Sequence, residues 1–104
     1  MIINRYKITE LLPETEALAA LAEECSELAQ AALKLRRSLD GTNWTPRTRS
    51  ECVDNMQEEI GDVLCCLVVL GFMEEEQPVR DFLSPAKADR WLSRLEEHRK
   101  EAQP

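Results

Sequence analysis

The sequence predicts an all-α fold, a helical bundle of about three to four helices, on three observations. Hydrophobic residues make up 43% and charged residues 32% of the 104 residues, which is the composition of a folded globular chain. With only three glycines and two phenylalanines, the chain has little material for a turn-rich β fold. Apolar residues also recur three and four positions apart over two long stretches, which is typical of helices with one buried face.

The first long helix is expected from Pro13 to about Leu39. Proline suits the first turn of a helix, and Gly41 stands where a left-handed residue commonly ends one. The first twelve residues show no clear period. The predicted buried stripe of this helix consists of Leu18, Leu21, Cys25, Leu28, Ala32, Leu35 and Leu39.

A loop over residues 40–46 is expected to join this helix to a second, antiparallel helix, because the segment is rich in turn-forming residues. Thr45 is predicted to cap the second helix and Pro46 to open it, with the helix running to about Met73. Its later half is apolar nearly all round, so it must be covered on several sides. Its longest apolar run, 63–73, is far shorter than the roughly 20 residues of a membrane span.

Residues 74–83 are interpreted as a connection with room for one helical turn, after which Ser84 and Pro85 begin a third helix. Trp91 is expected in the core of this helix, together with Ala88, Leu92 and Leu95 on its apolar face. The same helix is locally basic through Lys87, Arg90, Arg94, Arg99 and Lys100.

Charge and cysteine usage limit the classes of protein. The net charge of −7 argues against a protein that binds nucleic acid through a basic surface. The four cysteines form no Cys-x-x-Cys motif, and no signal peptide is recognised, so we expect buried, reduced thiols in a cytoplasmic protein. A chain this short buries a small fraction of its surface, which favours an oligomer.

Two acidic motifs carry the chemistry. Residues three apart lie on one helix face, so Glu24 and Glu27 point the same way on the first helix, as do Glu59 and Asp62 on the second. Four carboxylates beside the apolar stripes would repel one another unless a cation neutralises them. Mg²⁺, or alternatively Mn²⁺, is the natural partner, because hard divalent ions prefer oxygen ligands and leave positions for phosphate oxygens.

Two other interpretations of the motifs stay open. Glu-x-x-Glu is common on solvated helix faces, although two such pairs on antiparallel helices are more specific than one. A di-iron bundle usually needs Glu-x-x-His motifs, and the single histidine, His98, is expected at the surface of another helix. Glu23 and Glu58 precede the two pairs and are expected to lie outside the ligand set or to face solvent.

The segments Glu23-Glu24-Cys25-Ser26-Glu27 and Glu58-Glu59-Ile60-Gly61-Asp62 resemble the Glu-Glu-x-x-Glu and Glu-x-x-Asp motifs of the all-α nucleoside triphosphate pyrophosphohydrolases, the MazG-like group. The resemblance covers about residues 13–73 and includes the Gly-Thr-Asn-x-Thr-Pro loop. It implies a single all-α domain over residues 1–104 whose site is completed by oligomerisation, as a homodimer or a tetramer of dimers.

The activity implied by the resemblance is Mg²⁺-dependent hydrolysis of ribo- or deoxyribonucleoside triphosphates to a monophosphate and pyrophosphate, in removal of non-standard or surplus nucleotides. Glu24, Glu27, Glu59 and Asp62 would be the metal ligands. Glu27 and Glu59 are the candidate catalytic residues, with Glu27 as the carboxylate that orients or deprotonates water.

A triphosphate also needs binding residues. Trp44 stands where related Asn-Pro-Thr-Pro strings have proline, and it either stacks on a base or packs against protein. The basic candidates have an alternative role as ordinary surface charges. The candidate substrate-binding residues are Lys34, Asn43, Trp44, Asn55, Lys87 and Arg90.

A competing function is a catalytically silent nucleotide-binding or helical interaction module that keeps the bundle without turnover. The four intact carboxylates favour the enzyme. The two hypotheses differ in whether pyrophosphate is released.

Overall fold

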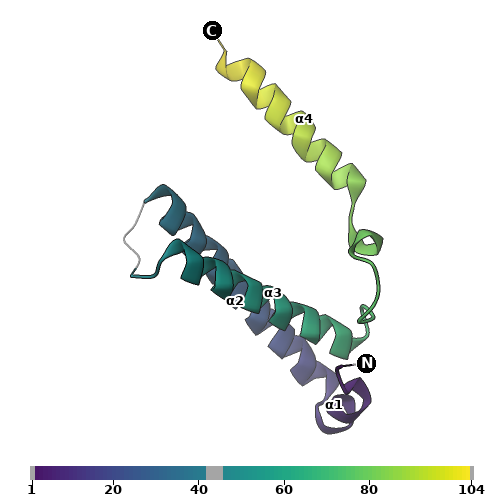
Figure 1. The fold of residues 1–104 in the computed structure, drawn as a ribbon. Helices are drawn as coiled ribbons and strands as arrows, with labels where there is room; N and C mark the ends of the chain where they lie inside the picture. The colour runs from purple at the N-terminus through teal and green to yellow at the C-terminus, as the bar shows by residue number, and fades with distance from the viewer. Residues whose placement is uncertain (1, 42–45, 104) are drawn as a thin grey trace.

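The computed structural model describes residues 2–41 and 46–103, and within these ranges it contains helices and no strand (Figure 1). This confirms the all-α prediction. Asn43, Trp44 and Thr45 lie outside the described residues. In chain order the elements are α1 (Arg5–Leu11), α2 (Glu14–Asp40), α3 (Arg49–Leu70), the 3-10 helix η1 (Val79–Phe82) and α4 (Pro85–Ala102).

The bounds of α2 agree with those expected. Pro13 stands immediately before the helix, and Gly41 ends it in the left-handed conformation with φ 67°. The Gly41 N–H donates to the Arg37 carbonyl at 2.9 Å, which satisfies one of the carbonyl groups left free at a helix end.

The start of α3 differs from the prediction, because Thr48 caps the helix and Pro46 precedes it. The Thr48 hydroxyl accepts from the Glu51 N–H at 3.2 Å, and the Glu51 carboxylate accepts from the Thr48 N–H at 3.1 Å. These reciprocal bonds form a capping box. The hydrogen bonds from Thr48 also lower the pKa of Glu51.

The end of α3 was predicted at about Met73, but the helix stops at Leu70. Gly71 takes φ 84°, its N–H donates to the Val68 carbonyl, and the Phe72 N–H donates to the Leu67 carbonyl, each at 3.0 Å. This Schellman pattern ends the helix inside its apolar run. No helix in the described ranges is both long and apolar enough to cross a membrane.

α2 and α3 lie side by side and antiparallel, forming a hairpin (Figure 1). The buried residues of the two helices have small or medium-sized side chains: Ala17 and Ala31 on α2, and Cys52 and Val68 on α3. Small side chains let two helix backbones approach closely, so side chains on the facing surfaces of the hairpin are brought together.

α1 was not expected from the sequence, because seven residues are too few to show a helical period. It packs on the end of α3, and its start is capped by Asn4, whose side chain accepts from the Lys7 N–H. Glu75 also accepts hydrogen bonds from the Ile2 and Ile3 N–H groups, at 2.9 and 2.8 Å. The N-terminal segment is therefore tied to the connection that follows α3.

α4 begins at Pro85 with Ser84 as its cap, as predicted, but it points away from the hairpin (Figure 1). All of its residues are exposed, and Trp91, expected in a core, is 61% exposed. No other helix in the described ranges packs on its apolar face. The prediction that Trp91 is a core residue is therefore wrong for the single chain.

The predicted stripe of α2 is likewise only partly covered. Leu21, Leu28 and Leu35 are half-buried, whereas Leu18 and Leu39 are exposed. The cysteines follow the same trend: Cys52 is buried, Cys66 is half-buried, and Cys25 and Cys65 are exposed. A two-helix hairpin has no third layer, so an apolar face that does not point at the neighbouring helix stays in contact with water.

Candidate metal centre

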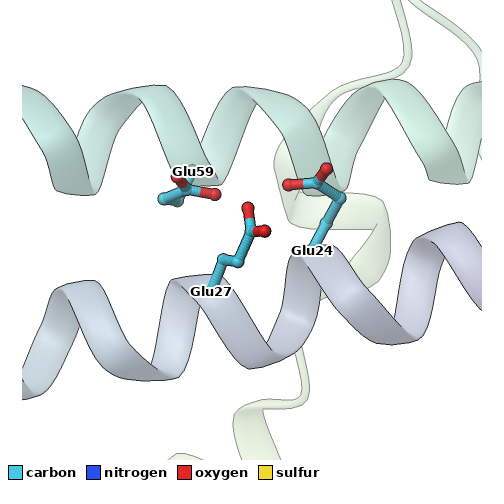
Figure 2. Close-up of side chains that lie close together, drawn as sticks. All are labelled: Glu24, Glu27 and Glu59. Carbon is cyan, nitrogen blue, oxygen red and sulfur yellow. The ribbon is translucent and has the colours of Figure 1, made fainter.

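Three carboxylates meet between the helices of the hairpin. Glu24 and Glu27 extend from α2, and Glu59 extends toward them from α3 (Figure 2). One oxygen from each carboxylate lies within 4.8 Å of the others. The structure therefore brings together three of the four predicted metal ligands.

Helix periodicity explains why these side chains face one another. Glu24 lies seven residues after the buried Ala17 and seven before the buried Ala31, so it shares their side of α2. On α3, Glu59 lies seven residues after the buried Cys52. On both helices a glutamate therefore stands seven residues from a small buried residue, and the two glutamates lie at the same level of the hairpin.

Burial differs among the three carboxylates. Glu24 and Glu59 are half-buried, and Glu27 is exposed. One oxygen of Glu24 and one of Glu59, both Oε2, are shielded from solvent and have no hydrogen-bond partner in the described part of the chain. A buried carboxylate oxygen without a partner is unfavourable, and a bound cation relieves that cost.

The electrostatics of the site follow from this crowding. Burial, followed by the negative charge of Glu27 and then of Asp62 and Glu59, raises the pKa of Glu24 from 4.5 to about 7. Burial also raises the pKa of Glu59, with the charges of Glu27 and Asp62 adding to the effect. Without a cation, the cluster therefore holds protons at a pH where isolated glutamates are ionised.

Asp62, the fourth predicted ligand, lies one turn after Glu59 on α3 and is half-buried. Its charge contributes to the raised pKa values of both Glu24 and Glu59, so it belongs to the same electrostatic neighbourhood. It is not among the three side chains whose oxygens lie within 4.8 Å of one another.

The donor set fits a hard divalent cation. All three ligand groups are carboxylates, the ligand type that Mg²⁺ prefers together with water and phosphate. Glu24 and Glu59 offer carboxylate oxygens from opposite helices, one of them shielded and unpartnered on each residue, and Glu27 is the exposed member of the cluster.

Cys66 lies near the carboxylate cluster but is not part of either acidic motif. Burial raises the pKa of its thiol, and the charges of Glu24, Cys65 and Asp62 add to the rise. The thiol is therefore held in its neutral form, which is neither nucleophilic nor metal-binding. Its seven-residue spacing from Glu59 is the sequence signal that places it at this surface.

The hairpin offers few groups for a triphosphate. Residues 14–33 and 50–70 contain no lysine or arginine, so the charged side chains at the level of the carboxylates are all acidic. Lys34 is half-buried on α2, two turns after Glu27, and Asn55 is half-buried on α3, one turn before Glu59. These two predicted substrate-binding residues lie on the loop side of the carboxylates.

The remaining predicted substrate-binding residues are not near the carboxylates. Lys87 and Arg90 are exposed on α4, which points away from the hairpin (Figure 1). Asn43 and Trp44 lie outside the described residues. His98, to which no ligand function was given, is exposed on α4.

Comparison with known proteins gives one positive result. Neither the curated proteins nor the solved structures contain a significant match to the chain. The family model of the MazG nucleotide pyrophosphohydrolase domain matches residues 13–83, a span that includes α2, α3, η1 and all four acidic residues of the two motifs. The match covers more than half of the chain, and the chain therefore belongs to the MazG nucleotide pyrophosphohydrolase family.

Proposed function

We propose that this protein hydrolyses nucleoside triphosphates, ribo- or deoxyribo-, to a nucleoside monophosphate and pyrophosphate, with Mg²⁺ or Mn²⁺ bound by Glu24, Glu27, Glu59 and Asp62. The supporting observation is that Glu24 and Glu59, whose carboxylates come within 4.8 Å of each other from opposite helices, each have one shielded oxygen without a hydrogen-bond partner. Family membership supports the same class of reaction. We propose that residues 1–104 form a single domain. The protein would act in the cytoplasm and remove non-standard or surplus nucleotides.

In the proposed reaction, the oxygen of a water molecule bonds to the α-phosphorus, and the bond from that phosphorus to the oxygen bridging to the β-phosphate breaks. Pyrophosphate leaves with that oxygen. When bound, a divalent cation neutralises charge on the phosphate oxygens and makes water a stronger acid. Glu27 is the proposed proton acceptor, because it is the exposed member of the cluster and can pass the proton to solvent.

Glu59 has a different proposed role. It lies opposite Glu24 and Glu27 on the other helix (Figure 2). From there it would hold a bound cation against α2 and so help to position the phosphates. Lys34 and Asn55 are proposed to bind the nucleotide on the loop side of the site. Four other residues remain proposed to bind the substrate: Lys87, Arg90, Asn43 and Trp44. Lys87 and Arg90 lie on α4, so they could do so only if α4 approached the hairpin formed by α2 and α3.

The deciding experiment measures pyrophosphate release from a panel of ribo- and deoxyribonucleoside triphosphates, with Mg²⁺, with Mn²⁺ and with chelator. Glu59→Ala is compared with Glu58→Ala, which removes the same group from the adjacent, exposed position. We expect metal-dependent release that falls about a hundredfold or more in Glu59→Ala, the scale of losing one preorganised electrostatic group. Glu58→Ala should retain activity.

The same assay separates the alternative. If folded protein binds Mg²⁺ and nucleotide but releases no pyrophosphate from any substrate, the catalytic proposal is wrong and a silent nucleotide-binding module is the better description. Equal activity of the Glu59 and Glu58 variants would instead remove Glu59 from the site.

A further inference from the structure

The N-terminal segment lies at the end of the hairpin where α2 begins and α3 ends (Figure 1). It contains α1, which has seven residues, none of them buried. A helix this short is not stable in water by itself, so its contacts with the rest of the chain decide whether α1 stays in place. Within α1 the half-buried residues are Arg5 and Ile8.

One carboxylate holds the start of this segment. Glu75, in the connection that follows α3, accepts hydrogen bonds through Oε1 from the Ile2 and Ile3 N–H groups, at 2.9 and 2.8 Å. The connection is itself fixed, because the Gln77 N–H donates to the Glu74 carbonyl at 3.1 Å and the Glu74 N–H donates to the Gln77 side chain at 3.2 Å. Hydrogen bonds to a charged acceptor are stronger than neutral ones, so Glu75 is a firm attachment point for the segment.

Two other features make this attachment easy to release. The Arg5 guanidinium group lies 3.8 Å from the Glu74 carboxylate, whose side chain is 72% exposed, and an exposed ion pair contributes little to stability. The second oxygen of Glu75, Oε2, is shielded and has no hydrogen-bond partner among the described residues, which is unfavourable. Since this carboxylate lies against the N-terminal segment, releasing the segment gives water access to it and relieves that cost.

An apolar hollow of about 130 Å³ lies between α1 and the hairpin, and it is called the α1 hollow. Ile8 of α1 and Leu12, directly after it, form the side that belongs to the N-terminal segment. The other lining residues come from the hairpin and its entry: Ala17, Ala20, Cys65, Cys66 and Val69. Moving α1 away therefore uncovers the hairpin side of the hollow.

The α1 hollow adjoins the carboxylate cluster. Ala20 lies one helical turn before Glu24 on α2, and Cys66 lies one turn after Asp62 on α3, so each pair shares a helix face. Burial raises the pKa of the Cys66 thiol, and the charges of Glu24 and Asp62 add to the rise, which requires both carboxylates to be near the thiol. The hollow is thus the next level of the hairpin from the cluster.

We propose that residues 2–12 form a strap over this end of the hairpin, that Glu75 latches it, and that its release opens the α1 hollow to solvent. The strap opens as a local unit, because α1 contributes none of the buried residues of the hairpin. The family match begins at residue 13, so it does not include the strap.

Opening of the strap would let water approach the carboxylate cluster through the α1 hollow, and closing would exclude it from this end of the site. That consequence rests on the proposed function. The latch itself rests on hydrogen bonds, exposure and the hollow, and it is tested without nucleotide or metal.

The test is the rate at which cysteines of the full chain react with N-ethylmaleimide in chelator at one pH. Glu75→Ala removes the latch, and Glu76→Ala removes the same group from the adjacent, exposed position. We expect Cys66 to react about tenfold faster in Glu75→Ala, the scale of losing hydrogen bonds to a charged group, and at the wild-type rate in Glu76→Ala. Mass spectrometry of peptide fragments separates Cys66 from its exposed neighbour Cys65.

Cys52 provides the internal control for unfolding of the whole chain, because it is buried and does not line the α1 hollow. Its rate should be the same in the wild type and in both variants. If Cys52 and Cys66 accelerate together in Glu75→Ala, the hairpin itself has opened and the proposal of a separate strap is wrong. Equal Cys66 rates in the two variants would show that Glu75 is not the latch.

Amide hydrogen exchange gives a second measurement. The Ile8 N–H donates to the Asn4 carbonyl at 3.1 Å, and the Leu12 N–H donates to the Ile8 carbonyl at 2.8 Å, so both amides are protected while α1 is formed. Residues 5–12 should exchange about tenfold faster in Glu75→Ala, whereas α2 and α3 should keep their wild-type protection. Unchanged exchange of residues 5–12 would overturn the proposal.

Discussion

At the scale of single residues, the hairpin places glutamates where its packing calls for small apolar side chains. Glu24 lies between the buried Ala17 and Ala31, and Glu59 follows the buried Cys52, each at a spacing of seven residues. Each glutamate keeps one shielded oxygen without a hydrogen-bond partner among the described residues. In the absence of a cation these groups oppose folding. We therefore expect the carboxylate cluster to lower the stability of the metal-free protein and to bind a cation that restores it.

The first residue-scale prediction concerns Glu59→Gln. The neutral amide removes a half-buried charge that has two carboxylates opposite it, so the melting temperature of the chelator-treated protein should rise above that of the wild type. The increase in melting temperature on adding Mg²⁺ should disappear. Thermal denaturation in chelator and in Mg²⁺ measures both, with Glu58→Gln as the control. A fall in stability in chelator would indicate that Glu59 makes favourable contacts of its own.

The second residue-scale prediction is a pH dependence. Because the pKa of Glu24 rises from 4.5 to about 7 on folding, the folded state binds more protons than the unfolded state between these values. The free energy of unfolding of the metal-free protein should then fall as pH rises from about 4.5 to 7 and level off above. Mg²⁺ replaces the proton, so the stabilisation by Mg²⁺ should grow over the same window.

Urea denaturation at several pH values, with chelator and with Mg²⁺, checks this dependence. Glu24→Gln cannot ionise at this position and should show a flatter profile in chelator. A profile identical to that of the wild type would mean that Glu24 does not carry the effect.

At the scale of elements, helix ends decide how the two acidic motifs meet. The capping box of Thr48 and Glu51 sets the start of α3, and Gly71 sets its end. Glu59 and Asp62 lie on this helix. Where the helix begins and ends therefore determines where these two residues lie along the hairpin relative to Glu24 and Glu27. Gly71 takes a left-handed φ of 84°, which strains any other residue, and a side chain there would have to displace the Arg5 guanidinium group.

The element-scale prediction is that Thr48→Ala destabilises the protein by about 1 kcal/mol, the usual cost of losing a helix cap. Ser50→Ala is the matched control, because it removes a hydroxyl from the same turn without removing a cap bond. Chemical denaturation of both variants gives the comparison. Equal effects would show that the capping box adds nothing to stability.

At the scale of the whole molecule, the single chain has too small a core for its apolar content. In the described ranges the buried hydrophobic residues are Ala17, Ala31, Cys52 and Val68, whereas many larger ones are exposed. Faces expected to be buried on α2, α3 and α4 are all partly open to solvent. This pattern supports the proposal that the protein is a homodimer or a tetramer of dimers.

The whole-molecule prediction follows from mass action. If folding requires association, the melting temperature should rise with protein concentration, because dilution favours the unassociated chain. Calorimetry over a hundredfold range of concentration, in chelator, measures this without any contribution from metal binding. A melting temperature independent of concentration, together with a sedimentation mass of 11.9 kDa, would show that the single chain is stable alone.

The sequence was sufficient for those features that depend on neighbours along the chain. Helical period, the cap at Ser84 and the left-handed Gly41 are local, and each is found in the structure where it was expected. The two acidic motifs are local as well, because a spacing of three residues places two side chains on one helix face. The all-α class and the family followed from these same residues.

What the sequence left undecided depends on contacts between elements. It did not show that Gly71 would end α3 inside an apolar run, or that Thr48 rather than Thr45 would cap it, because several residues there offer similar ends. It also placed Trp91 in a core that a single chain does not provide. Only the tertiary structure brought Glu59 against Glu24 and Glu27 and raised the pKa values of Glu24 and Glu59, because burial and charge repulsion arise when two helices pack.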